Sequence, residues 1–188
     1  MQNYHRHTSY SNIWGFKDSA AVNEDYAKRA VELGHKVISS VEHGFQGYYF
    51  ETYELSKKYD LKFIFGCEAY WVKDRHEKDR TNSHIILLAK NENGRRAINS
   101  VLSTASEDGY YFRPRLDTEL LLSLPADDVF VTTACILSGI TMTLKILLSN
   151  FTNISKTTLC LKFSITKQKH KSISINEFWH CLKSMVLK

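Results

Sequence analysis

The sequence predicts an α/β protein in which strands alternate with helices along residues 1–135. Short runs of β-branched and apolar residues, such as residues 37–41 and 129–133, are typical of strands. Between them lie segments whose apolar residues recur every three or four positions, which indicates helices packed against a sheet. Because parallel neighbours need a crossover connection, this alternation predicts parallel pairing, in either an α/β barrel or an open sheet.

The first half of this region is expected to hold three strands and two helices. An apolar stripe with spacings of three and four residues runs from Val22 to Leu33, and Gly34 is placed to end that helix. An Asp or Ser side chain can satisfy free N–H groups at its start. In order, we expect a strand at residues 3–7, a helix from Asp18 or Ser19 to Leu33, a strand at residues 37–41, a helix at residues 48–59 and a strand at residues 61–65.

The second half continues the alternation. Residues 73–82 are highly charged and are expected to form a solvated loop. A buried strand at residues 85–89, a helix at residues 92–105 and a last strand at residues 129–133 follow. Side chains that can bind metals fall at or near the ends of these strands, where α/β barrels and open sheets place their active sites.

Bulk properties fit one globular domain followed by a segment of different composition. No run approaches ~18 consecutive apolar residues and the N-terminus has no apolar signal region, so we expect a cytoplasmic protein with no membrane partner. Residues 136–188 hold eight lysines and one acid, whereas residues 1–135 carry a net charge of −2. This change predicts a domain at residues 1–137 and an atypical basic tail at residues 138–188.

Several residues could bind a divalent metal together. His5 and His7 stand at positions i and i+2 of the expected first strand, so their side chains share a face roughly 6.6 Å apart. Taken alone, each candidate has an ordinary structural reading, such as a polar turn or a small buried hydrophobe. Taken together, ligands of mixed N, O and S type predict a Zn²⁺, Mn²⁺ or Fe site that activates water, as in two-metal phosphoesterases. The remaining candidates are Asp18, Glu42, His43, Glu68, His84 and Cys135.

At these residues the sequence resembles the PHP (polymerase and histidinol phosphatase) domain, in the form that opens bacterial DNA polymerase III alpha subunits. The resemblance runs from about residue 3 to residue 137, and its motifs occur in the family's order. They are HRHTSYS at residues 5–11, EHG at 42–44, GCE at 66–68, HIILLAKN at 84–91, FRPRLD at 112–117 and TTAC at 132–135.

The resemblance implies a distorted (β/α)7 barrel, incomplete in this chain, with up to three divalent metal ions, Zn²⁺ or Mn²⁺. DNA and replisome subunits are the implied partners. The implied catalytic residues are His5, His7, His43 and Glu68, and Arg113 and Arg115 are candidate contacts for substrate phosphate. The positions that match metal ligands are His5, His7, Asp18, His43, Glu68, His84 and Cys135, and Glu42 is retained as a further candidate from the residue pattern.

The sequence departs from the family pattern at three places, one of which is the stretch at residues 14–18 that holds Asp18. Glu42 replaces the usual Asp of the second motif. The family's last ligand motif, Asp-x-His, is missing, since residues 136–188 contain no Asp. We hypothesise a frameshift near residues 136–155, because residues 156–166, read one frame over with permitted codons, spell the family-like NNFMLEVQYH. A genuine divergent tail is the alternative, and the nucleotide sequence decides between them.

Three functions remain open at this point. The leading interpretation is an N-terminal PHP-domain fragment of a replicative alpha subunit, with metal-dependent phosphoesterase or 3′–5′ exonuclease-type chemistry. A stand-alone phosphatase for a small phosphate ester is the second, although residues 84–91 and 112–117 resemble the polymerase branch. A non-catalytic metal-binding scaffold is the third. The polymerase regions themselves are absent, so this chain alone is not expected to polymerise DNA.

Overall fold

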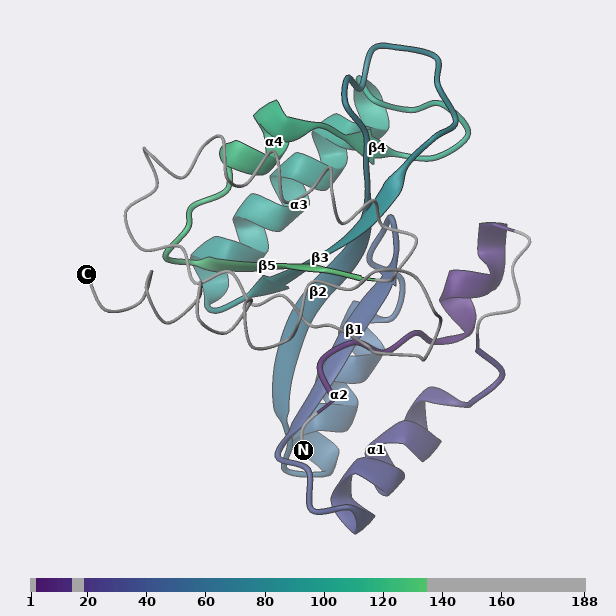
Figure 1. Cartoon of the computed structure of the whole chain (residues 1–188). Coiled ribbons are helices and arrows are strands. Elements are labelled where there is room, and N and C mark those ends of the chain that lie inside the picture. The colour runs from purple at the N-terminus through teal and green to yellow at the C-terminus, as the bar shows by residue number, and fades with distance from the viewer. Residues whose placement is uncertain (1–2, 15–18, 135–188) are drawn as a thin grey trace, which may run out of the picture.

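The computed structural model describes residues 3–14 and 19–134 of the 188-residue chain (Figure 1). The expectations for Asp18, for Cys135 and for the tail at residues 138–188 lie outside the described residues. In order, the elements are the 3₁₀ helix η1 (Ser9–Trp14), α1 (Asn23–Glu32), β1 (Val37–His43), α2 (Tyr49–Lys58), β2 (Lys62–Trp71), β3 (Ser83–Ala89), α3 (Glu92–Glu107), β4 (Arg115–Leu116), α4 (Thr118–Leu122) and β5 (Val129–Thr133).

The strands form one mixed five-stranded sheet with the order β1-β2-β3-β5, and β4 pairs with β2. The mixed α/β class is therefore confirmed. β2 runs parallel to β1 and β4, as expected, but the β2–β3 and β3–β5 pairs are antiparallel. The prediction of parallel pairing is wrong for these two pairs. A loop without a helix joins β2 to β3, and such a connection returns the chain antiparallel to the strand it leaves.

The expected first strand is absent from the described part of the chain. Residues 3–8, the N-terminal arm, run along β1 without regular pairing. Their backbone meets β1 through the Val41 N–H, which donates to the Arg6 carbonyl at 3.3 Å. The side chains of Arg6 and Thr8 hold the arm against β1, so its position depends on contacts that strand propensity does not predict.

The start of the first helix also differs from the expectation. α1 begins at Asn23, four residues after Ser19. The Ser19 N–H donates to the Asn12 side chain and its carbonyl accepts from the same amide, so Ser19 is tied to η1 and does not cap α1. The other expected helices and the strands at residues 37–41, 85–89 and 129–133 are confirmed within a few residues, and β2 extends beyond the expected end to Trp71.

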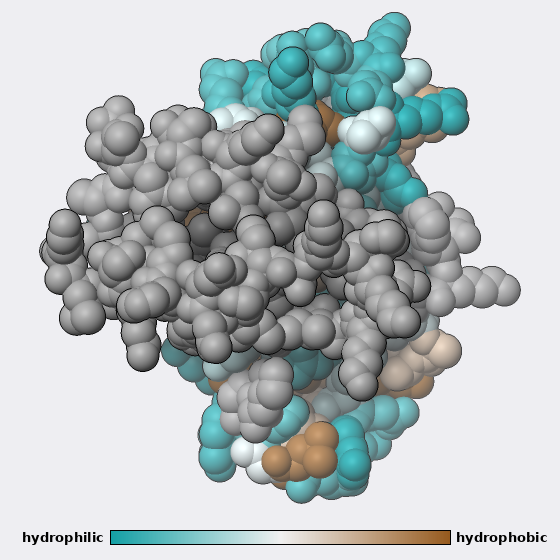
Figure 2. All heavy atoms as spheres, in the orientation of Figure 1, coloured by the Kyte–Doolittle hydropathy of each residue, from teal (hydrophilic) through white to brown (hydrophobic). Residues whose placement is uncertain are grey.

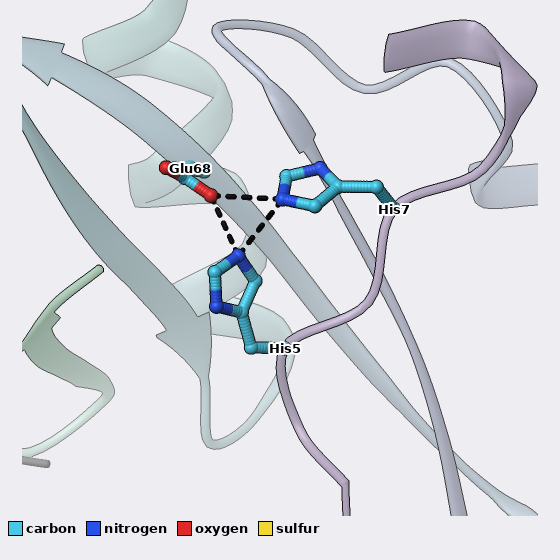
Figure 3. A group of neighbouring side chains, drawn as sticks. All are labelled: His5, His7 and Glu68. Atoms are coloured by element: carbon cyan, nitrogen blue, oxygen red, sulfur yellow. Dashed lines mark hydrogen bonds and ion pairs between the residues drawn. The ribbon is translucent and has the colours of Figure 1, made fainter. Parts of the chain in front are cut away.

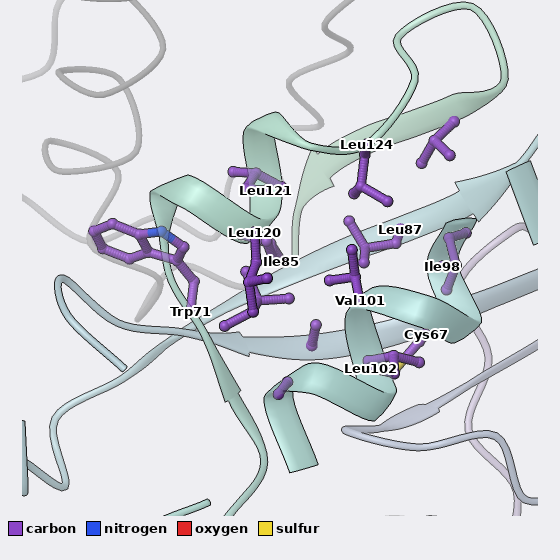
Figure 4. Close-up of a cluster of buried hydrophobic side chains, with 14 of the residues drawn as sticks. Cys67, Trp71, Ile85, Leu87, Ile98, Val101, Leu102, Leu120, Leu121 and Leu124 are labelled. Carbon is purple, nitrogen blue, oxygen red and sulfur yellow. The ribbon is translucent and has the colours of Figure 1, made fainter. Parts of the chain in front are cut away.

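The main hydrophobic core lies between one face of the sheet and helices α3 and α4 (Figure 4). Alternate residues of β2, including Cys67 and Trp71, point into it. The side chains contributed by the other elements include Ile85, Leu87, Ile98, Val101, Leu102, Leu120, Leu121 and Leu124. A smaller cluster joins α1, α2 and β1 through Ala27, Ala30, Ile38, Leu55 and Leu61. The opposite face of β2 is thereby left for polar side chains.

The loop between β2 and β3 is solvated, as its charge predicted. Its side chains are mostly exposed, and Figure 2 shows hydrophilic residues gathered at the top of the molecule, where Figure 1 draws this loop. Within residues 73–82, Arg75 is the buried exception and pairs with Asp117 at 2.8 Å. Among the described residues, the helices are too short or too polar to cross a membrane.

Candidate metal centre

Three adjacent strands present polar side chains on the sheet face opposite the core. Glu68 and Tyr70 alternate along β2 with residues of the hydrophobic cluster, so they point to the other side. In the parallel β1–β2 pair, His43 is the register partner of Glu68. In the antiparallel β2–β3 pair, His84 stands opposite Tyr70. The register of the sheet therefore gathers His43, Glu68 and His84 on one surface.

The N-terminal arm adds two histidines to this surface (Figure 3). His5 Nε2 lies 2.6 Å from Glu68 Oε2, and His7 Nε2 lies 3.0 Å from the same oxygen. The two ring nitrogens lie 2.9 Å from each other. One carboxylate oxygen of β2 and two imidazole nitrogens of the arm therefore converge on one point.

The other oxygen of Glu68 belongs to a second group. His84 Nδ1 lies 2.7 Å from Glu68 Oε1, and His43 Nδ1 lies 3.8 Å from it. In the described part of the chain, the two groups that could hold a metal are thus His5–His7–Glu68 and His43–Glu68–His84. They share Glu68, so each oxygen of this one carboxylate could serve a different metal ion.

Glu68 is deeply buried, with 3% of its side chain exposed. Burial by itself raises the pKa of its carboxyl group, but hydrogen bonds with the neighbouring histidine rings, that of His5 first, outweigh burial and hold that pKa far below 4.5. Glu68 is therefore an anion at neutral pH, and its charge faces the histidine rings. A buried anion of this kind requires cations close to it.

The donor set fits a divalent metal. Imidazole nitrogen and carboxylate oxygen are ordinary ligands of Zn²⁺ and Mn²⁺. Metal–ligand bonds of about 2.0–2.1 Å in a tetrahedral site place ligand atoms roughly 3.4 Å apart. The observed separations of 2.6, 2.9 and 3.0 Å in the arm group are about 0.4–0.8 Å shorter, so the side chains would have to move apart by less than about 1 Å to hold an ion.

Glu42 was expected as a ligand, but the structure places it in neither group. It is fully buried, and its two oxygens accept hydrogen bonds from Thr8 and Ser11. Neighbouring residues of a strand point to opposite faces, so His43 and Glu42 cannot both face Glu68. Strand alternation could have been applied to the sequence alone, and it would have predicted that only one of these two residues faces Glu68.

The two arginines expected at substrate phosphate occupy different environments. Arg115 is 2% exposed. Its guanidinium donates to the backbone carbonyls of Arg75, Glu77, Asp79 and Gly109, so it holds the loop between β2 and β3 in place. These contacts occupy the donors that a phosphate would need, and they give Arg115 a structural role.

Arg113 lies beside the second group of ligands. Its Nη1 donates to Tyr70 Oη at 2.5 Å, and its guanidinium carbon lies 4.8 Å from the centre of the tyrosine ring. The Tyr70 ring in turn lies 5.0 Å from the His84 ring. Burial raises the pKa of Tyr70 to about 12, so its hydroxyl stays protonated. Sequence reasoning missed Tyr70, although its position two residues after Glu68 on one strand predicts a shared face.

Comparison with known proteins identifies relatives of this chain. The PHP domain family matches residues 3–177. DNA polymerase III subunit alpha of Aquifex aeolicus is 32% identical over 143 residues, covering 70% of this chain and 12% of that protein. The corresponding subunit of Borreliella burgdorferi is 31% identical over 138 residues, with coverages of 70% and 12%. That of Helicobacter pylori strain 26695 is 34% identical over 120 residues, with coverages of 62% and 10%.

The chain thus spans about a tenth of the length of these curated relatives. Among solved structures, it is similar to a crystal structure provisionally described as a metal-dependent phosphoesterase from Bifidobacterium adolescentis. The two are 18% identical with a TM-score of 0.38, and the match covers 56% of this chain and 34% of that one.

Proposed function

This chain belongs to the PHP domain family, and on that premise we propose that it is the N-terminal PHP portion of a replicative DNA polymerase III alpha subunit with metal-dependent phosphoesterase chemistry. The observation that carries this proposal is Glu68, a buried carboxylate that joins two groups of histidines. A carboxylate bridging two metal sites suits the hydrolysis of phosphate esters.

The described residues have separate roles in this chemistry. Metal ions bound at the two groups would supply a water molecule of lowered pKa and neutralise charge on the phosphate. His5, His7 and Glu68 would hold one ion, and His43, His84 and Glu68 the other. Asp18 and Cys135 are proposed as further ligands, for up to three ions in all, with Zn²⁺ or Mn²⁺ as the metals.

Arg113 is the proposed contact for the substrate phosphate. Its guanidinium lies near the His84 side of the centre and can donate several hydrogen bonds to phosphate oxygens. Tyr70 orients it through the hydrogen bond to Oη and through its ring face. DNA is the proposed substrate, attacked at a 3′ end, and the proposed partners are the subunits of a cytoplasmic replisome.

We further propose that the mixed sheet is part of a distorted (β/α)7 barrel. The placement of α3 and α4 on one face, with the ligands on the other, supports this arrangement. The proposed domain comprises residues 1–137, and residues 138–188 are proposed to be a basic tail altered by a frameshift. Sequencing the gene beyond residue 188 tests the tail, because a shifted frame interrupted by stop codons would reject the frameshift.

The test of function is hydrolysis by the purified 188-residue chain, stripped of metal and then supplied with Mn²⁺ or Zn²⁺. We expect it to shorten a 5′-labelled single-stranded DNA from the 3′ end. Glu68→Gln should abolish both metal retention and cleavage, because the amide removes the bridging charge. Glu107→Gln, an exposed change at the end of α3, is the matched control.

The same assay separates the alternatives. Cleavage of p-nitrophenyl phosphate but not of DNA would replace the exonuclease proposal with a small-ester phosphatase. Stoichiometric metal without any hydrolysis would indicate a scaffold. Failure of the chain to bind metal would overturn the proposed function as a whole.

A further inference from the structure

Glu42 is fully buried and its hydrogen bonds are complete without a metal. Its Oε1 accepts from the Thr8 hydroxyl at 2.6 Å, and its Oε2 accepts from the Ser11 hydroxyl at 2.5 Å. The Thr8 backbone N–H lies 3.2 and 3.1 Å from the two oxygens. An ionised carboxylate has only acceptors, so every one of these partners must donate to it.

Ser11 therefore has no hydrogen left for another partner. A serine hydroxyl carries one hydrogen and two lone pairs, and its hydrogen is committed to Glu42. The same Ser11 oxygen lies 2.9 Å from His7 Nδ1 and 3.4 Å from the His43 backbone nitrogen. Both nitrogens must donate to it, so His7 carries its proton on Nδ1.

The position of this proton determines which His7 nitrogen can bind a metal. A neutral imidazole has one N–H and one lone pair, so a proton on Nδ1 leaves the lone pair on Nε2. Nε2 is the atom that faces Glu68 Oε2 and His5 Nε2. The opposite tautomer would point an N–H at the place where an ion would bind.

We propose that Glu42 and Ser11 are positioning residues that hold His7 in the Nδ1–H tautomer and so prepare Nε2 as a metal ligand. Glu42 acts through Ser11 and does not touch the metal itself. This assignment rests on the proposed metal site, and it reassigns Glu42 from the ligand set to its support. Supporting hydrogen bonds of this kind orient ligating histidines in metal sites generally.

The tautomer is measurable in the metal-free 188-residue chain. Long-range ¹H–¹⁵N correlation spectra of ¹⁵N-labelled protein distinguish a protonated ring nitrogen from one with a lone pair. We expect the His7 signals of a ring whose Nδ1 carries a proton, since Nδ1 donates to the Ser11 oxygen. A lone pair on His7 Nδ1 would overturn the proposal without the need for any variant.

Two serine variants on the same 3₁₀ helix test the consequence for metal binding. Ser11→Ala removes the acceptor of His7 Nδ1, so we expect His7 to populate both tautomers. Zn²⁺ affinity, measured by competition with a chelator, should fall about 10–100-fold. Ser9→Ala is the matched control, because the Ser9 side chain is exposed and its hydroxyl contacts Tyr48 at 3.3 Å.

The outcomes distinguish this inference from the proposed function. Equal Zn²⁺ affinities of the folded Ser11→Ala and Ser9→Ala variants, checked by circular dichroism, would overturn the positioning role. A His7 ring protonated on Nδ1 in a chain that binds no Zn²⁺ would support the tautomer assignment while overturning the metal function. If Ser11→Ala does not fold, the spectrum of the unaltered chain still decides the tautomer.

Discussion

Glu68 concentrates the electrostatics of the site in one side chain. His5, His7 and His84 lie within 3.0 Å of its two oxygens, and His43 lies 3.8 Å away. Without metal, hydrogen bonds with the neighbouring histidine rings stabilise the carboxylate, and bound metal ions would take over this role. The same residue is therefore tied both to folding and to ligand binding.

The lowered pKa of Glu68 predicts a pH dependence of stability. In the unfolded chain its carboxyl group titrates near the ordinary value of 4.5, whereas in the folded chain its pKa is far lower. Folding is therefore favoured by this group above pH ~4.5, and the contribution is lost as the pH falls below that value towards the folded pKa. Urea unfolding of the metal-free chain at a series of pH values should show this loss.

The variant Glu68→Gln removes the titrating group and provides the comparison. Its free energy of unfolding should fall less steeply below pH ~4.5 than that of the unaltered chain. Glu107→Gln, whose side chain is exposed, should retain the steep dependence. Parallel curves for all three proteins would show that Glu68 is not stabilised by its histidine partners.

Most residues of the described site could be predicted from the sequence. His5, His7, His43, Glu68 and His84 were all predicted, and the structure brings all five together. Glu42 was predicted as a metal ligand because it adjoins His43 in the sequence. The direction of its side chain, however, depends on strand alternation, which turns it away from Glu68. Ser11 and Tyr70 were missed because a hydroxyl that orients another group has no distinctive spacing.

Among the elements, the N-terminal arm is anchored by a buried arginine. Arg6 Nε and Nη2 donate to the Ser39 carbonyl at 2.9 and 2.5 Å, and Nη1 donates to Asn23 Oδ1 at 2.5 Å. Nη2 also lies 3.3 Å from Thr52 Oγ1. One buried guanidinium thus connects the arm to β1, α1 and α2. Burial lowers the pKa of Arg6 to about 10, which still leaves it charged at neutral pH.

We predict that Arg6→Lys destabilises the fold by about 1–3 kcal/mol. A lysine ammonium cannot donate in the planar fork that reaches Ser39 and Asn23 together, so at least one buried acceptor loses its partner. Chemical denaturation measures this difference. The control is Arg29→Lys on the exposed face of α1, where the change should stay within about 0.5 kcal/mol. Equal effects would mean that the arm is held by other contacts.

Elements that span more than two periods of their own pattern were predictable, and those that span fewer were not. β5 was predicted at its observed bounds, and α3 within two residues of its end. β4 and α4 have two and five residues, too few to show a hydrophobic period, and both were missed. α4 begins at a local signal, since Asp117 accepts from the Leu120 N–H, but such a cap alone does not predict a helix.

For the whole molecule, the site connects parts of the chain that are far apart in sequence. His5 of the arm and Glu68 of β2 are separated by 63 positions. The class of fold was predictable from alternating patterns, but strand direction was not. Direction depends on whether a connection crosses over or turns back, and the loop between β2 and β3 could have done either.

Because the proposed metal ligands come from distant parts of the chain, we predict that bound metal stabilises the whole fold. A ligand that binds only the folded state raises the free energy of unfolding by about 2.7 kcal/mol at a free concentration of 100 times its Kd. Thermal unfolding should therefore shift to higher temperature with Zn²⁺ or Mn²⁺ and return after chelation. Glu68→Gln should show a much smaller shift, and an equal shift would place the metal elsewhere.

The alternation of side chains along β2 also constrains how the sheet can assemble. Cys67 and Glu68 are neighbours on opposite faces, one in the hydrophobic core and one among the histidines. If β2 paired one residue out of step, the Glu68 carboxylate would enter the core beneath α3 and an apolar side chain would face the imidazoles. Burying an unpaired carboxylate costs several kcal/mol or more. The charge that prepares the centre for metal therefore also selects against misaligned sheets during folding.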